Sequence, residues 1–516
     1  MGDALMRKVS LSDKYTQRDG PVFISGIQAL VRLPLIQKEK DRLQNLNTAG
    51  FISGYKGSPL GGYDLELSRG KRFLDDALVF HQPGLNEELA ATSVWGSQQA
   101  EFLGRGKHDG VFGIWYGKGP GVDRAMDALK HANAAGTSPY GGVLAIAGDD
   151  HGAKSSTLPH QSDHNFVSAF IPYLYPSGIS DIVPYGLLGI AMSRFSGCWS
   201  GMKIVSDVAD AAMVYDTALE SFDIIIPSDE FLGQYAESAR NILYKDSPRD
   251  QDFRLQRVKG FAAQSFGRAN NIDKTIWKGP NTKIGIITSG KSYGDVREAL
   301  RWLDIDEERA KDLGVGLYKV GMPWPLEPEG IREFCENLDH ILVVEEKREL
   351  IEHQIKWQLY NWKEKVRPTV VGKQDESGNW LLPPENDLPL EVIVEVVARR
   401  IYKSTNNAEL LERLKWINKR HQEQGSISSP IQRKPYFCSG CPHSTSTLIP
   451  SGSHSLGGIG CHYMAVDMDR GTELYTQMGG EGTPWIGQSP FSKEEHIFAN
   501  LGDGTYKHSG LLAIRA

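Results

Sequence analysis

The sequence predicts a multi-domain α/β protein in which parallel sheets are flanked by helices. Short apolar runs alternate with helical patterns between about residues 20 and 225, and the same alternation returns between about 281 and 400. Strands that alternate with helices are typical of crossover connections, which place neighbouring strands parallel. A chain of 516 residues, 40% of them hydrophobic, is long enough for about three such units.

The first predicted domain covers residues 20–245. Its strands are expected in the segments AGFISGY, DGVFGIWYG, GGVLAIAGDD, MKIVSD and FDIIIPSDE. Between two of these strands, the segment DRAMDALKHANAAG predicts a helix that ends at Gly136 as its cap. Its apolar residues recur at helical spacing, namely Ala125, Met126, Leu129 and Ala132.

Two loops of this domain carry polar residues that could serve a site: GYKGSPLGGYD, at 54–64, and GLNEELAATSVWGSQQAEFLG, at 84–104. In the second loop Asn86 predicts the cap of a helix whose first turn carries Glu87 and Glu88, where the helix dipole favours carboxylates. Capping explains these acids without any chemistry, and a solvated helix start is the default for at least one of them.

The second predicted domain covers residues 280–400, with strands in KIGIITSG, VGLYKVGMPWP and HILVVEEKREL and a helix through REALRWL. The polar stretch VRPTVVGKQDESGNWLLPPENDLP predicts a loop at its edge. A helix follows in NAELLERLKWINKRHQ, and QEQGSISSPIQRKP predicts a linker. The third predicted domain covers residues 430–516, with its last strand in HIFANLG.

Composition excludes several classes of protein. The chain has 57 Lys plus Arg against 64 Asp plus Glu, a net charge of −7, which disfavours nucleic-acid binding. The sequence has neither a membrane-spanning apolar run nor a secretion signal, so we expect a cytoplasmic protein without membrane contact. Five cysteines are too few for a disulfide scaffold. Cys198 and Cys335 are isolated in apolar surroundings and are predicted to be buried packing residues.

The segment IFANLGDGTYKHSG contains the first candidate site. An apolar strand runs into Gly502, Asp503 and Gly504, which places a carboxylate at the carboxyl end of a sheet strand, where open α/β sheets bind ligands. Asp503 could hold a Mg²⁺ ion that binds phosphate oxygens, and the glycines would let phosphates approach. A tight Asp-Gly turn without any ligand is the alternative.

The segments FCSGCPH and GGIGCH contain a second candidate site. Cys438 and Cys441 have the spacing of a metal clamp, and Cys461 follows twenty residues later. Zinc would need His462 or His443 as a fourth ligand, whereas an iron–sulfur cluster has no fourth cysteine nearby. On spacing alone a zinc site is at least as favoured as a cluster, and free thiols are the remaining alternative.

Ordered motifs along nearly the whole chain resemble the indolepyruvate ferredoxin oxidoreductase family of thiamine diphosphate enzymes. They are GYKGSP, NEELAA, MDALKHANAAG, GGVLAIAGDDHGAKSS, MPWPLEPE, FCSGCPH, GGIGCH and GDGTYKHSG. The resemblance implies that the domain at 20–245 binds the pyrimidine ring, that the domain at 280–400 resembles the transketolase C-terminal domain, and that the segment 430–516 begins a diphosphate-binding domain.

The resemblance also implies roles for individual residues. Glu87 would be the acid that hydrogen-bonds the aminopyrimidine ring, and Glu88 is the weaker candidate. Ser58 and Pro59 would line the cofactor. Asp503 would bind Mg²⁺, and the diphosphate would lie beside Gly502 and Gly504. A 4Fe-4S cluster would be bound by Cys438, Cys441 and Cys461. The resemblance therefore favours iron over zinc at these cysteines.

The implied enzyme is a 2-oxoacid:ferredoxin oxidoreductase that acts on an oxo group with an iron–sulfur acceptor. It would decarboxylate an arylpyruvate, transfer the acyl group to coenzyme A and pass electrons to ferredoxin, and it would form a homo-oligomer. Lys118, Asp150 and His151 follow predicted strands and could line the substrate pocket. Two alternatives stay open: an enzyme for another 2-oxoacid, such as pyruvate or 2-oxoglutarate, and a non-catalytic scaffold with a zinc knot.

One part of the family pattern is missing from this sequence. Thiamine enzymes need a second Mg²⁺ ligand, usually an Asn about 25 to 30 residues after the Asp of the GDG motif. Only thirteen residues follow Asp503, and no further cysteine occurs there. We therefore expect the chain to be an N-terminal fragment of a longer, fused protein or an open reading frame that was cut short, ending inside a helix in LLAIRA. By themselves, these 516 residues are expected to bind the cofactor poorly and to turn over little.

Overall fold

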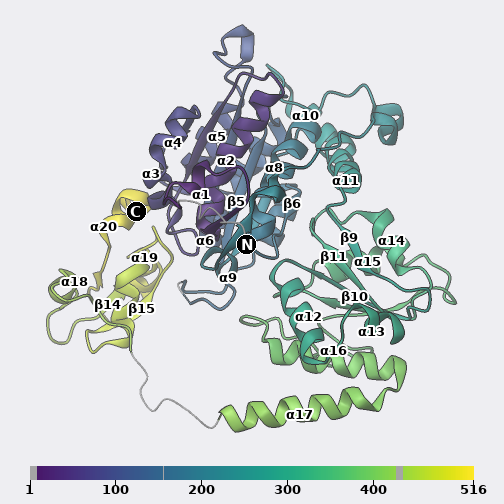
Figure 1. The fold of residues 1–516 in the computed structure, drawn as a ribbon. Coiled ribbons are helices and arrows are strands. Elements are labelled where there is room, and N and C mark those ends of the chain that lie inside the picture. The colour runs from purple at the N-terminus through teal and green to yellow at the C-terminus, as the bar shows by residue number, and fades with distance from the viewer. Residues whose placement is uncertain (1–8, 155, 426–433) are drawn as a thin grey trace. The chain divides into compact units, whose positions relative to one another are not determined.

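The computed structural model describes residues 9–154, 156–425 and 434–516, and the described strands form four sheets. The contacts divide the chain into two units, Met1–Arg420 and His421–Ala516, and each unit combines helices with parallel strand pairs (Figure 1). The expected linker QEQGSISSPIQRKP lies largely outside the described residues. Among the described helices, none is both long enough and apolar enough to cross a bilayer.

The largest sheet has six strands in the order β3-β2-β4-β5-β7-β6, and every neighbouring pair is parallel. Its central strands are buried along their whole length, which explains why they read as continuous apolar runs rather than as alternating patterns. The strands are β2 (Thr48–Gly54), β3 (Val79–His81), β4 (Gly110–Lys118), β5 (Val143–Asp149), β6 (Tyr173–Leu174) and β7 (Ser200–Val205).

Helices cover both faces of this sheet (Figure 1). One face carries α5 (Glu87–Ser97) and α6 (Gly119–Ala135), and the other carries α2 (Gly26–Leu43) and α8 (Ile179–Ser196). The predicted cap of α6 is confirmed, because the N–H of Gly136 bonds Ala132 O at 2.9 Å. Shorter helices in the same part of the chain are α1 (Asp13–Thr16), α3 (Tyr63–Arg69), α4 (Lys71–Asp76), α7 (Asp163–Ala169), α9 (Ser206–Ala209), α10 (Pro248–Arg254) and α11 (Gly260–Ala269).

The strand expected in FDIIIPSDE is wrong, because this segment is irregular and partly exposed. Asn270 takes the place of a neighbouring strand: its Oδ1 accepts the N–H of Ile225 at 2.8 Å, and its Nδ2 donates to Ile225 O at 2.8 Å. The sequence reading also missed an antiparallel pair, which joins β1 (Pro21–Ser25) to β8 (Ala212–Asp216).

The second sheet has five strands in the order β13-β12-β10-β11-β9, of which only the edge strand β9 is antiparallel to its neighbour. The expected loop in VRPTVVGKQDESGNWLLPPENDLP in fact begins with an edge strand, β13, which pairs with β12. The strands are β9 (Lys274–Trp277), β10 (Ile284–Ser289), β11 (Val315–Val320), β12 (His340–Val344) and β13 (Thr369–Val371).

Helices again lie on both faces of the second sheet. The helix predicted in NAELLERLKWINKRHQ is confirmed as α17, with Leu410, Leu414 and Ile417 buried. Cys198 and Cys335 are buried, as predicted. The helices are α12 (Gly290–Trp302), α13 (Glu307–Asp312), α14 (Pro328–Cys335), α15 (Ile351–Leu359), α16 (Leu390–Thr405) and α17 (Ala408–Gly425).

The segment after β11, which contains MPWPLEPE, joins the two sheets of the first unit. Tyr173 N donates to Trp324 O at 3.0 Å, and Tyr175 N donates to Gly321 O at 2.9 Å. The carboxylate of Asp273 holds the start of this segment, since Oδ1 accepts the N–H groups of Gly321 and Met322 at 2.8 and 2.9 Å. Although part of Asp273 reaches solvent, its Oδ2 atom is buried, and burial raises the pKa of Asp273 to about 7.

Replacing Asp273 with Asn is expected to stabilise the protein at high pH. Because the folded pKa of about 7 lies above the ordinary value of 3.8, the charged carboxylate opposes folding, and stability falls as pH rises from about 4 to 7. Asp273→Asn should therefore raise the melting temperature by a few degrees at pH 8 and by less at pH 5. The exposed Asp339 is the control, because Asp339→Asn should change neither value. An equal gain at both pH values would contradict the prediction.

The second unit contains a three-stranded parallel sheet in the order β15-β14-β16. The last strand lies in HIFANLG, as predicted, and LLAIRA forms the helix α21. The elements are β14 (Ser455–Gly457), β15 (Thr472–Tyr475), β16 (Phe498–Ala499), α18 (His443–Ser446), α19 (Pro484–Gln488), α20 (Asp503–Thr505) and α21 (Leu511–Arg515).

Candidate functional site

The carboxyl edge of the six-stranded sheet gathers several of the predicted site residues. The loop that contains Ser58 and Pro59 follows β2, Lys118 ends β4, and Asp150 and His151 follow β5. These three strands are neighbours in the sheet and run parallel. Open α/β sheets bind ligands at such an edge, so this is the candidate site of the first unit.

Glu87 lies at this edge, at the start of α5. The helix begins there because Asn86 Oδ1 accepts the N–H of Leu89 at 2.9 Å, which confirms the predicted cap. Trp115 Nε1 on β4 donates to the backbone oxygen of Glu87 at 2.9 Å and fixes the helix against the sheet. Glu87 is 3% exposed, whereas Glu88 is exposed. At the start of this helix, therefore, Glu88 is solvated and Glu87 is not.

Glycines at the start of α6 make room for the Glu87 side chain. A Cβ atom at Gly121 would lie 2.5 Å from Glu87 Oε1, and one at Gly117 would lie 3.3 Å from Glu87 Cγ. The carboxylate therefore lies directly against the backbone of Gly121. Burial lowers the pKa of the neighbouring Lys118, while the negative charges of Glu87 and Asp150 oppose that shift. Carboxylate and ammonium groups thus share one half-buried edge.

The loop with Ser58 and Pro59 packs onto the same edge. A Cβ atom at Gly57 would meet Lys118 Cδ at 2.7 Å, and one at Gly148 would meet Pro59 Cδ at 3.1 Å. The far end of the loop is tied to β4, because the hydroxyl of Tyr116 donates to Asp64 Oδ1 at 2.7 Å. Sequence reasoning missed the Tyr116–Asp64 bond, since no local pattern links two residues so far apart in the chain.

Replacing Gly121 with Ala is expected to displace the Glu87 carboxylate. The new methyl group would lie within 2.5 Å of both Cγ and Oε1 of Glu87, so the side chain must move. If this edge binds thiamine diphosphate, as the resemblance implies, Gly121→Ala should weaken that binding by at least about tenfold, measured by titration calorimetry. The control is Gly96→Ala in α5, where a Cβ atom meets nothing within 4 Å. If both variants bind the cofactor as tightly as the unchanged protein, Glu87 is not confined as described.

The GDG motif lies in the second unit, at the carboxyl end of β16. Asp503 starts the short helix α20 and is exposed, so the alternative of a tight Asp-Gly turn is not what forms. A Cβ atom at Gly502 would lie 3.7 Å from His462 Nδ1, and nothing lies within 4 Å of one at Gly504. The motif is therefore open to a ligand, and His462 is its nearest buried neighbour.

The three clustered cysteines do not converge on one point. Cys438 and Cys461 are exposed, and Cys441 is partly exposed with its Sγ 3.0 Å from His443 Nδ1. The rings of His443 and His462 lie edge to face, 4.6 Å apart between centroids. Within residues 9–154, 156–425 and 434–516, no three His, Cys, Asp or Glu side chains are arranged to hold a metal ion. The ligand types suit a metal, but this arrangement does not, and we derive no reaction step through it.

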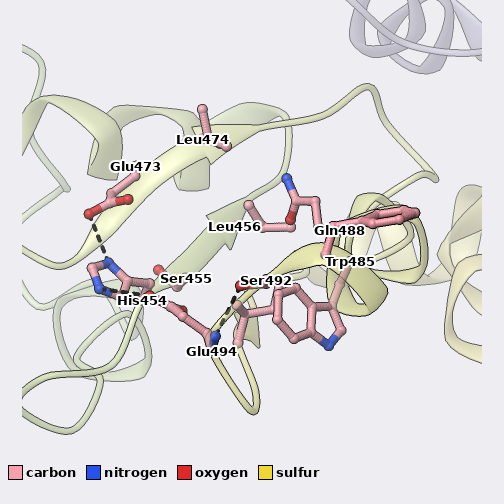
Figure 2. A pocket seen from close by; sticks show the side chains of 12 residues that line it. His454, Ser455, Leu456, Glu473, Leu474, Trp485, Gln488, Ser492 and Glu494 are labelled. Atoms are coloured by element: carbon pink, nitrogen blue, oxygen red, sulfur yellow. Dashed lines mark hydrogen bonds and ion pairs between the residues drawn. The ribbon is translucent and has the colours of Figure 1, made fainter.

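A cavity of about 430 Å³ lies elsewhere in the second unit, beside β14 and β15. Figure 2 shows His454 between two acids: its ring pairs with Glu473 at 2.8 Å and with Glu494 at 3.3 Å. None of the residues that line the cavity is a predicted site residue. This cavity and the candidate chemistry therefore do not coincide, and the buried Glu87 edge has the stronger chemical argument.

Known proteins of one family are similar to this chain. Residues 274–424 match the indolepyruvate oxidoreductase domain. Indolepyruvate oxidoreductase subunit IorA of Thermococcus kodakarensis is 28% identical over 255 residues, which are 45% of this chain and 36% of that protein. The IorA subunit of Pyrococcus horikoshii is 26% identical over 434 residues, which are 76% of this chain and 60% of that protein. Residues 274–424 therefore match the family's domain, and the chain is similar to these IorA subunits.

The resemblance read from the ordered motifs is thereby confirmed, although the match spans only 36% and 60% of the length of these two IorA relatives. A solved 2-oxoglutarate:ferredoxin oxidoreductase from Magnetococcus marinus, with 2-oxoglutarate, coenzyme A and succinyl-CoA bound, has a TM-score of 0.53 and 15% identity. It covers 74% of this chain and 66% of that one, and it confirms the α/β fold class.

Proposed function

We propose that this indolepyruvate oxidoreductase relative is a 2-oxoacid oxidoreductase that decarboxylates an arylpyruvate with thiamine diphosphate. The observation that carries the proposal is the buried Glu87 carboxylate at the carboxyl edge of a parallel sheet, with Gly121 leaving space for it. The relatives named indolepyruvate oxidoreductase support the same class of substrate.

The residues at this edge fit the pyrimidine half of such a cofactor. When bound, thiamine diphosphate would supply a nucleophilic carbon that adds to the keto group and accepts the electrons left by carbon dioxide. The Glu87 carboxyl would hold a proton at the pyrimidine ring, because a buried carboxyl can share a short hydrogen bond there. Ser58 and Pro59 would line the ring. Lys118 would attract the carboxylate of the 2-oxoacid by its charge.

The second unit would contribute the diphosphate half. Asp503 would hold Mg²⁺, since Mg²⁺ prefers carboxylates together with phosphate oxygens, and Gly502 and Gly504 would lie beside the diphosphate. We also propose that ferredoxin accepts the electrons and that coenzyme A accepts the acyl group in a homo-oligomeric enzyme. Cys438, Cys441 and Cys461 remain the predicted ligands of a 4Fe-4S cluster, but because their side chains do not converge, no electron-transfer step is derived through them.

A binding and turnover experiment tests the proposal. The purified full chain is titrated with thiamine diphosphate and Mg²⁺ in a calorimeter, and viologen reduction is then followed with indolepyruvate, phenylpyruvate, pyruvate and 2-oxoglutarate. We expect measurable but weak cofactor binding and slow reduction that is fastest with an aromatic 2-oxoacid. Fastest reduction with pyruvate or 2-oxoglutarate would show that the substrate is not an arylpyruvate. Absence of cofactor binding would refute the proposed function.

A non-catalytic scaffold with a zinc knot is the second candidate. It is favoured by the contact of Cys441 with His443 and by the edge-to-face contact of His443 with His462, because mixed sulfur and nitrogen ligands are typical of zinc. Metal analysis after anaerobic purification separates the two functions. Iron with inorganic sulfide supports electron transfer, whereas one colourless zinc ion per chain supports the scaffold.

A further inference from the structure

The segment that follows β5 connects the second sheet to the candidate site. We infer that its described residues, 150–154 and 156–161, form a strap through which residues 345–348 and Asp387 position the carboxyl edge of the first sheet. This inference rests on the proposed function, since the edge that the strap touches is the candidate cofactor site.

The strap is anchored at its start by a buried ion pair with the loop after β12. His151 Nδ1 lies 3.4 Å from Glu346 Oε2, and both side chains are 2% exposed. Burial alone would raise the pKa of Glu346, but the hydrogen bond from His151 and the charges of His151 and Lys291 lower it to about 2. Glu346 is therefore charged at neutral pH. Lys347 Nζ adds a hydrogen bond to the backbone oxygen of His151 at 3.3 Å.

Two further anchors follow along the strap. Lys154 Nζ pairs with Asp387 Oδ2 at 3.3 Å, and that carboxylate lies so close to Gly152 that a Cβ atom there would be 2.4 Å from it. At the end of the strap, Gln161 is bound twice: its Nε2 donates to Arg348 O at 2.9 Å, and its Oε1 accepts the N–H of Arg348 at 3.1 Å. The second sheet thus holds the strap at both ends.

The strap reaches the candidate site through Asp150 and His160. Asp150 is buried and its charge acts on Lys118, which ends β4. The ring of His160 covers the first turn of α6, because a Cβ atom at Gly119 would lie 2.4 Å from its Cγ. His160 Nε2 also lies 3.6 Å from Asp123 Oδ2 on α6. The same turn of α6 holds Gly121 against Glu87, so loosening the strap would loosen the wall behind that carboxylate.

The strap is closed at its base within the first sheet. Ser162 donates through N and Oγ to the two carboxylate oxygens of Asp149 at 2.8 and 2.6 Å, and His160 N donates to Asp150 O at 3.3 Å. Because its base is fixed, the outer anchors decide where the strap lies over α6. Glu346 and Gln161 are therefore positioning residues rather than catalytic ones.

Hydrogen exchange of the full chain without cofactor tests the inference. Glu346→Gln removes the negative charge from the buried contact with His151. Gln161→Leu is the milder change and removes the two hydrogen bonds with the backbone of Arg348. In both variants we expect exchange to become at least about tenfold faster in peptides that cover 150–161 and 119–124, but not in 130–135. Cofactor affinity should fall by a similar factor, with smaller loss of the maximal rate.

The matched control breaks a different contact between the same two sheets. Lys319 on β11 pairs with Asp181 on α8 at 2.6 Å, and Asp181→Asn should leave exchange of 119–124 unchanged. The inference is overturned if the control accelerates that peptide equally, or if Gln161→Leu loosens 150–161 without affecting 119–124. If the unchanged protein fails to bind thiamine diphosphate, the proposed function fails, whereas the exchange result still decides whether the strap positions α6.

Discussion

Glu87→Gln is expected to reduce 2-oxoacid-dependent electron transfer by at least about a hundredfold, the usual scale for loss of a positioned acid or base. The amide has nearly the same shape as the carboxyl, so the packing against Gly121 and the bond from Trp115 to the backbone stay intact. What the variant loses is the ability to hold or release a proton at the cofactor ring. The effect should therefore appear in the rate far more than in stability.

Exchange of the C2 proton of bound thiamine diphosphate with solvent deuterium measures this step directly, and NMR can follow it without any electron acceptor. The matched control is Glu88→Gln, which changes the adjacent, exposed residue of the same helix turn. We expect the control to keep the exchange rate of the unchanged protein. Equal rates for Glu87→Gln and the control would remove Glu87 from the proposed chemistry.

Lys203→Met is expected to cost about 3–5 kcal/mol of folding free energy, the scale for leaving a buried charge without its partner. Lys203 on β7 is 1% exposed, with its ammonium 2.5 Å from Asp163 and 3.6 Å from Asp149. Burial alone would lower the pKa of Lys203, but these two carboxylates raise it above its ordinary value. Methionine fills the space of the side chain but leaves both buried acids without their cation, although Ser162 still donates to Asp149 and Tyr173 to Asp163.

Chemical denaturation measured by circular dichroism checks this prediction. The control is Lys71→Met, which breaks an exposed pair with Asp75 and should cost at most about 0.5 kcal/mol. Since the raised pKa means that the stabilising charge is present below about pH 10, the loss should be the same at pH 6 and pH 8. A loss for Lys203→Met no larger than that of the control would show that the buried cluster does not stabilise the fold.

Local sequence by itself determined the elements whose signals act within a few residues. Asn86 as a helix cap, Gly136 as the end of α6 and the apolar runs of β4 and β5 all follow from capping and periodicity. These signals stay valid because each depends on hydrogen bonds and burial that one segment provides for itself. The ordered motifs likewise predicted the family before any contact was known.

Tertiary structure decided the outcome where the local sequence pattern allowed more than one. Glu87 and Glu88 are alike as first-turn acids, and only the packing of Gly121 on α6 and Trp115 on β4 buries the first of them. The segment FDIIIPSDE has the composition of a strand, yet Asn270 satisfies the backbone of Ile225 instead of a neighbouring strand.

For the same reason, no local sequence pattern could predict the strap or the buried ion pairs. His151 meets Glu346 only after the two sheets have packed together, and Lys203 meets Asp163 only after α7 has packed on the first sheet. Pairing of charges depends on distance in space and on exclusion of water, and neither is encoded by spacing along the chain. The sequence therefore determined the elements and the family, whereas packing decided which polar side chains are brought together.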